Sequence, residues 1–424
     1  KKLSVYFSYS FFLTLIIGII FVVLSETIGI NFVTETLTFP EERINDVKTI
    51  FHISVVGFFF QIITLPFNSL IIAYEKMKVF AYISITEVIL KFIGVLMLFY
   101  SSIEKIVLYT LFISTISFFV FIIYFVYCRI KFNKVKIVLV KDHSDLKETY
   151  TFFSWNMLGS LASVLKNQGT NTVLNVFHGP ILNTARGIAF QLSGVINMFV
   201  FNFTQAIKLQ IYKYYADSKF DELNDLVVKS SKYQFFIVIL ISYPLLFETE
   251  FILDLWLKDY PYSAIIFTQL AIILSIVDSL SYSLMAAVLA TGKIKLYSIL
   301  VSGLIILNIP FSYYFLQYDL PPYIIVVISI LISIIAFFVR FYFYSKYYKR
   351  SKLKVLKKIL IPSVLVLVSS LILPYIVIIN YQPSILRFII SSFTCIISVI
   401  LFTYLFGLKA KEKNILKTII KNYN

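Results

Sequence analysis

The residues of this sequence that could do chemistry are charged and amide side chains placed inside long apolar runs. The densest group is Lys166, Asn167, Gln168, Asn171 and Asn175. An ionisable side chain in hydrocarbon costs about 2.5 to 3.5 kcal/mol on insertion scales, so it should face protein or water. Hydrogen bonding between helices would account for some of the amides. One lysine among four amides nevertheless favours a water-filled cavity.

Other buried cations and acids are sparse. Arg186 follows closely in the next run, whereas Arg340 near the end of a later run is interpreted as a side chain that snorkels to the membrane surface. Glu87 and Lys91 are spaced i and i+4, so they are either a self-neutralised pair or part of a site. Asp278 either titrates or pairs with a buried base.

The remaining reactive residue types show no catalytic or metal-binding spacing. His52, His143 and His178 are widely scattered, and Cys128 and Cys395 are far apart in sequence. There is no phosphate loop and no set of Ser, His and Asp. We therefore expect a protein that is not an enzyme, with no metal site and no cofactor.

The elements that must position these residues are membrane-spanning helices. Hydrophobic residues make up 59% of the 424 positions and charged residues only 14%. The apolar runs have roughly the 18 to 25 residues that a helix needs to cross a bilayer, and they lack the alternation of barrel strands. The predicted fold class is all-α, a multi-pass transmembrane helical bundle.

Reading the runs and their interruptions predicts twelve spans. They are residues 4–25, 49–73, 79–100, 104–128, 150–177, 181–207, 233–250, 262–290, 294–316, 321–345, 359–379 and 384–408.

Charge predicts the orientation of these spans. Lys and Arg collect in alternate connections, which places both termini on the cytoplasmic side and the acidic loop 26–48 outside. The segment Ser218–Lys232 has mixed charge and apolar residues at helical spacing, so we expect a short helix on the inner membrane surface. The net charge of +16 follows this distribution and does not indicate nucleic-acid binding.

Charged interruptions divide the chain into four parts. These are an N-terminal bundle of four helices at 1–130, a six-helix bundle at 149–346, an additional helix pair at 357–408 and a basic cytoplasmic tail at 409–424. Two further helices before Lys1 would complete two six-helix bundles, and we expect them to be missing from this chain. A site between two like bundles is typical of transporters.

Four stretches of the sequence resemble a known family. They are Lys166–Ala189 (KNQGTNTVLNVFHGPILNTARGIA), Asn202–Ala216, Pro66–Lys91 and Leu289–Lys295 (LATGKIK). The chain resembles the Wzx-type polysaccharide flippases, of the superfamily that also includes the MATE transporters and the lipid II flippase. The resemblance implies a MATE-like fold.

The resemblance also implies a function, movement of undecaprenyl-diphosphate-linked oligosaccharide across the bacterial cytoplasmic membrane for O-antigen or capsule assembly. The implied partners are the lipid-linked oligosaccharide, membrane lipids and other glycan assembly proteins. Lys91, Lys166 and Arg186 would compensate the diphosphate, and the amides would bind sugar hydroxyls. Glu87 or Asp278 would couple transport to H⁺ or Na⁺.

Two alternatives remain open. A MATE-type exporter of cationic drugs should have an excess of acidic residues within its spans. In this sequence the spans contain more cations than acids. A membrane glycan polymerase should carry a large outside loop.

Overall fold

The chain folds into two compact units, Lys1–Asp145 and Leu146–Asn424. The computed structural model describes residues 2–35, 44–101, 104–132, 135, 147–349, 351–410 and 412–414, and these residues form helices and connections without any strand. The predicted all-α fold class is therefore confirmed.

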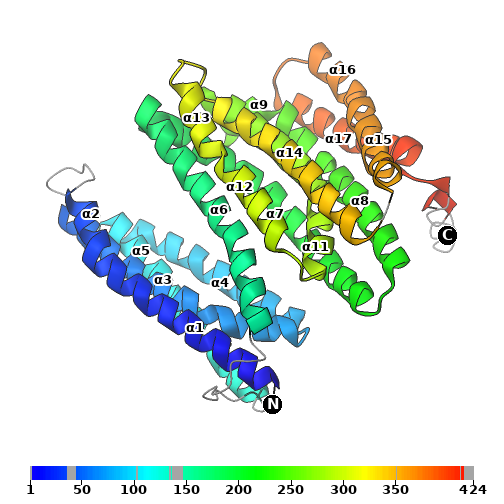
Figure 1. Cartoon of the computed structure of the whole chain (residues 1–424). Coiled ribbons are helices and arrows are strands. Elements are labelled where there is room, and N and C mark those ends of the chain that lie inside the picture. Colours follow the sequence, from blue (N-terminus) through cyan, green and yellow to red (C-terminus); the bar gives the residue numbers. More distant parts are fainter. Residues whose placement is uncertain are drawn as a thin grey trace. The chain divides into compact units, whose positions relative to one another are not determined.

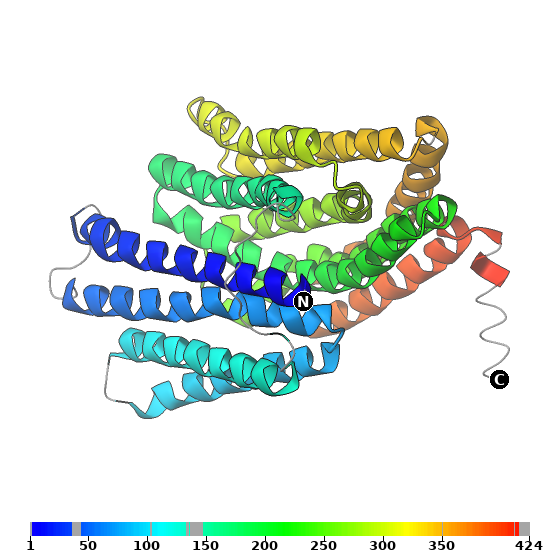
Figure 2. The same ribbon diagram turned by 60° about the horizontal axis from the view of Figure 1, so that its bottom comes forward.

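The first unit is built from four long helices that run side by side (Figures 1 and 2). Helix α3 packs against both α1 and α5, and α4 packs against α5. Buried Phe67, Ile71 and Tyr124 form its core. The elements are α1 (Lys2–Leu24), a π-helical turn (Ser25–Gly29), α2 (Ile30–Glu35), α3 (Ile44–Ala73), α4 (Met77–Met97), a 3₁₀ turn (Leu98–Tyr100) and α5 (Lys105–Lys131).

The second unit contains the longest helices and three spans that are broken near their middle (Figure 1). Its elements are α6 (Lys147–His178), α7 (Pro180–Ala216), α8 (Phe220–Phe247), α9 (Thr249–Leu257), α10 (Ser263–Ser279), α11 (Tyr282–Ala290), α12 (Lys295–Ile306), α13 (Asn308–Leu316), α14 (Ile324–Tyr347), α15 (Lys352–Ser370), α16 (Ile372–Asn380), α17 (Ile385–Phe402) and a π-helical turn (Thr403–Gly407).

Each of the twelve predicted spans coincides with a helix or a broken helix pair. Ten of the described helical segments are long and apolar enough to cross a membrane, and the bent pair α10–α11 would make an eleventh. The twelfth is α6, which carries the polar group Lys166–Asn175 and is correspondingly less apolar.

Two details of the expected topology are wrong. The segment Ser218–Lys232 is not a separate surface helix, because α8 begins at Phe220 and continues without interruption to Phe247. Its apolar residues Leu223 and Val227 are fully buried against neighbouring helices. The expected outside loop from Glu26 is also shorter, since residues 25–35 are helical.

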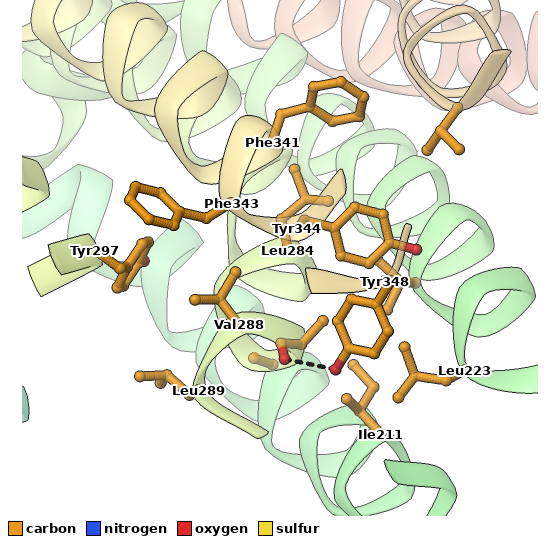
Figure 3. Packing of buried hydrophobic residues seen from close by; sticks show 14 of the residues in the cluster. Ile211, Leu223, Leu284, Val288, Leu289, Tyr297, Phe341, Phe343, Tyr344 and Tyr348 are labelled. Carbon is orange, nitrogen blue, oxygen red and sulfur yellow. Dashed lines mark hydrogen bonds between the residues drawn. The ribbon is translucent and has the colours of Figure 1, made fainter. Parts of the chain in front are cut away.

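A buried aromatic cluster joins six helices of the second unit, α7, α8, α11, α12, α14 and α15 (Figure 3). Tyr344 and Phe343 of α14 are at most 1% exposed. The Tyr348 hydroxyl donates to the carbonyl oxygen of Ala287 at 2.8 Å, so its polar end is satisfied inside the core. The cluster holds the α11 and α12 ends together next to the cavities described below.

The last helix pair is bound to α8 by buried ion pairs. Near one end of α8, the Glu248 carboxylate accepts from Arg387 Nη2 and Ser391 Oγ of α17, each at 2.8 Å. Near the middle of α8, Lys232 Nζ donates to the carbonyl oxygen of Gly407 at 3.1 Å and lies 3.6 Å from the Glu412 carboxylate. Lys232 and Glu248 are each about 1% exposed, so their charges depend on these partners.

Replacing Arg387 by alanine should destabilise the second unit, because it leaves the Glu248 carboxylate buried without its cation. The expected loss is about 3 to 5 kcal/mol, seen as a lower midpoint of thermal unfolding in detergent. Lys229→Ala is the control, since it breaks a solvent-exposed pair with Asp225 of a kind that contributes at most about 1 kcal/mol. Equal midpoints for the two variants would contradict this assignment.

Candidate functional site

The hairpin of α6 and α7 sets Arg186 against the polar stretch of α6. Helix α6 ends at His178, Gly179 takes a φ of 74°, and Pro180 begins α7. Glycine is favoured just after the end of a helix and proline at the first position of the next one. Asn171 and Arg186 lie at similar distances along the chain from this turn, so the two antiparallel helices bring them face to face.

Arg186 is held by α6 through three hydrogen bonds. Nη2 donates to Thr170 Oγ1 at 2.8 Å, and Nη1 donates to Asn171 Oδ1 and to the carbonyl oxygen of Asn167, both at 3.2 Å. The guanidinium also stacks over the Phe190 ring at 4.6 Å. Arg186 is only 7% exposed and has no carboxylate partner among the described residues, so its charge stays uncompensated.

Two adjoining cavities open inside the second unit. The larger has a volume of about 330 Å³ and the smaller about 190 Å³. The residues that line both are Lys166, Asn167, Asp278, Tyr282 and Ser329. Arg186 lines only the smaller cavity, with Thr170 and Phe190.

Lys166 is the cation common to both cavities. Its ammonium group makes no hydrogen bond or ion pair with any residue in the part of the chain that the structure describes. Close packing of α13 helps to hold this section of α6, because a Cβ on Gly169 would lie 2.6 Å from Ile309 Cδ1. Gly169 thus permits the approach of α13 one turn from Lys166.

Asp278 lies where a span is broken. Helices α10 and α11 meet at a 40° bend without a proline, and the Ser279 hydroxyl near it donates back to the Ile276 carbonyl, a bond that can bend helices. Asp278 accepts a hydrogen bond from Ser333 of α14. Its carboxylate therefore connects the bend with a neighbouring helix at the wall of both cavities.

Arg340 is the cavity residue for which the sequence interpretation was wrong. It lines the larger cavity, and its Nε is buried with no hydrogen-bond partner, so it does not snorkel away from the protein. A signal was present in the sequence, since Ser329, Ser333 and Arg340 recur at i, i+4 and i+11 and so form one stripe of α14.

Other serines of the larger cavity are also spaced so that they share one face of a helix. Ser298 and Ser302 share a face of α12, and Ser160 and Ser163 precede Lys166 on a face of α6. Serine is common in membrane helices as a packing residue, which is why these positions drew no attention in the sequence.

The other predicted site residues are distributed differently. Asn171 bonds Arg186, whereas Gln168 and Asn175 are exposed on α6 and line neither cavity. Glu87 and Lys91 belong to the first unit, where they form an ion pair of 2.6 Å along α4 with partly exposed side chains. No group of three or more His, Cys, Asp or Glu side chains that could hold a metal occurs among the described residues.

The charge balance of the cavities follows from these positions. Within the part of the chain that the structure describes, the cavities are lined by three cations, Lys166, Arg186 and Arg340, and by one carboxylate, Asp278. A low-dielectric wall strengthens this excess of positive charge. Such a cavity can bind an anionic group, and its hydroxyls can bind a polyol.

Comparison with known proteins identifies the fold. No family model matches the sequence, and no curated protein matches it. Among solved structures, the chain is similar to the lipid II flippase MurJ in an inward closed conformation, with a TM-score of 0.55 and 17% sequence identity over 95% of this chain and 83% of that one. This similarity shows that the two chains share a fold.

The contact between Thr170 and Arg186 can be tested by mutation. Thr170→Val removes the hydroxyl that accepts from Nη2 and should lower stability by about 1.5 to 3 kcal/mol, the usual range for a hydrogen bond to a charged group. Thr172→Val is the matched control, because its exposed hydroxyl bonds only the Gln168 carbonyl of its own helix. Thermal unfolding of both, alone and combined with Arg186→Gln, measures the coupling. Additive losses for Thr170→Val and Arg186→Gln would rule the contact out.

Proposed function

We propose that this chain is a flippase for lipid-linked oligosaccharide, moving undecaprenyl-diphosphate-linked glycan units across the bacterial cytoplasmic membrane by alternating access. The observation that carries the proposal is the excess of three cations over one carboxylate around the two cavities. A diphosphate must leave water to cross a membrane, and fixed positive groups in a low-dielectric site would offset its lost hydration.

The fold supports the same function. The solved structure to which the chain is similar is a lipid II flippase, and that protein's name describes a lipid substrate. A MATE-type exporter of cations is a weaker candidate, since a cation would be repelled by Lys166, Arg186 and Arg340.

We assign roles to the site residues as follows. Lys166 and Arg186 bind the diphosphate in the smaller cavity, and Asn167 and Asn171 orient them or contact the first sugar. Lys91, Gln168 and Asn175 are proposed to contact substrate at other stages of transport. Glu87 and Asp278 are the candidates for coupling to H⁺ or Na⁺.

A motion is part of the proposal. Alternating access needs an element with two arrangements, and the broken span α10–α11 with Asp278 at its bend offers one. Protonation of Asp278, or binding of a cation to it, would weaken its hydrogen bond with Ser333 and release this bend. Glycan assembly proteins that supply and use the substrate are the expected partners.

The proposal is tested by neutralising the cations in the full-length protein, produced in a bacterium that lacks its own flippase. Lys166→Gln and Arg186→Gln should each reduce surface glycan by roughly tenfold or more, as expected for the loss of one charge-assisted contact, while lipid-linked precursor accumulates. Lys229→Gln is the control, because Lys229 lies on α8 outside both cavities. Membrane abundance is measured for every variant. Normal surface glycan from both cavity variants would refute the proposal.

A further inference from the structure

The larger cavity has its own arginine. Arg340 lines this cavity and not the smaller one, whereas Arg186 lines the smaller cavity and not the larger. Lys166 lies on the wall that the two cavities share. Each cavity therefore combines the same lysine with a different arginine, and the proposed diphosphate site leaves Arg340 without an assigned ligand.

The lining of the larger cavity is rich in hydroxyl groups. It holds Ser160, Ser163, Ser298, Ser302, Ser329 and Ser333, together with Tyr282 and Tyr297. Ser302 is 2% exposed, and its hydroxyl, like Arg340 Nε, is buried with no partner in the described residues. Unpaired buried polar groups are uncommon, and both of these belong to residues that line the same cavity.

The volume and the charge of the larger cavity limit the class of ligand that it can bind. A volume of about 330 Å³ falls at the lower end of the roughly 300 to 1,000 Å³ typical of small-molecule sites. Among the described residues, the only carboxylate on its wall is Asp278, which already accepts from Ser333 and can offset no more than one of the two cations there. The cavity thus suits a small polyhydroxylated group that carries a negative charge.

We propose that the larger cavity is a second substrate subsite, in which Arg340 and Lys166 bind an oxyanion of the glycan and the serines bind its hydroxyls. This inference rests on the proposed function and adds the substrate class, a glycan with an acidic group. The oxyanion is either the carboxylate of an acidic sugar or a phosphate, and both would accept two hydrogen bonds from the planar guanidinium.

The test measures binding of soluble probes to the purified full chain by isothermal titration calorimetry. The probes are glucuronate, inorganic pyrophosphate and uncharged glucose. Wild type should bind at least one oxyanion more tightly than glucose, and Arg340→Gln should weaken that binding by roughly tenfold or more. Dependence on Arg340 for glucuronate identifies a sugar carboxylate, and dependence for pyrophosphate alone identifies a phosphate.

Two controls keep the test decisive. Arg340→Lys keeps the positive charge, so it should bind the oxyanion more tightly than Arg340→Gln does. It also keeps the test informative if Arg340→Gln fails to fold. Lys229→Gln should bind all probes as wild type does. Unchanged oxyanion binding in Arg340→Gln, or no preference of wild type for an oxyanion over glucose, would overturn the subsite.

The outcome is separable from that of the proposed function. Glycan export that is insensitive to Lys166→Gln and Arg186→Gln would refute the flippase function while Arg340-dependent binding still stands. Export that requires those residues, together with oxyanion binding that ignores Arg340, would overturn only the second subsite.

Discussion

The constraint on which the rest of the structure depends is the presence of positive charge inside an apolar helical unit. Arg186 is 7% exposed and has only neutral oxygens as hydrogen-bond acceptors, and Lys166 beside it has no partner in the described part of the chain. Buried charges are normally paired, and elsewhere this protein does pair them, as with Glu248 and Arg387. Charges left unpaired at a cavity wall are therefore best explained by a ligand that is anionic.

In the second unit, densely packed contacts lie next to cavities whose wall contains a broken span. The ion pairs at Lys232, in the middle of α8, and at Glu248, just after its end, bind α8 to the last part of the chain, and the aromatic cluster joins six helices. Residues of the broken span α10–α11 and of α12 also line the cavities. The proposed motion at the α10–α11 break would use this wall, in the way that other proteins change conformation around a bound ligand.

Much of the helical architecture could be predicted from the sequence, because apolar runs of spanning length leave few other possibilities. Lys166, Asn167, Arg186 and Asp278 were also found, since charge inside an apolar run is conspicuous, and the structure brings them to adjoining cavities. Arg340 was misread because it lies near the end of a run, where the sequence cannot distinguish a buried side chain from one that snorkels. Ser218–Lys232 was misread as a surface helix because its charges are mixed. The serines were missed because serine in a membrane helix fits packing as well as binding.

The most direct measurement is an experimental structure of the full-length protein in lipid nanodiscs with undecaprenyl diphosphate. If the account is right, the phosphate groups will lie within hydrogen-bond distance of Lys166 and Arg186. Phosphate density bound elsewhere, with both side chains facing lipid or bulk water, would contradict it.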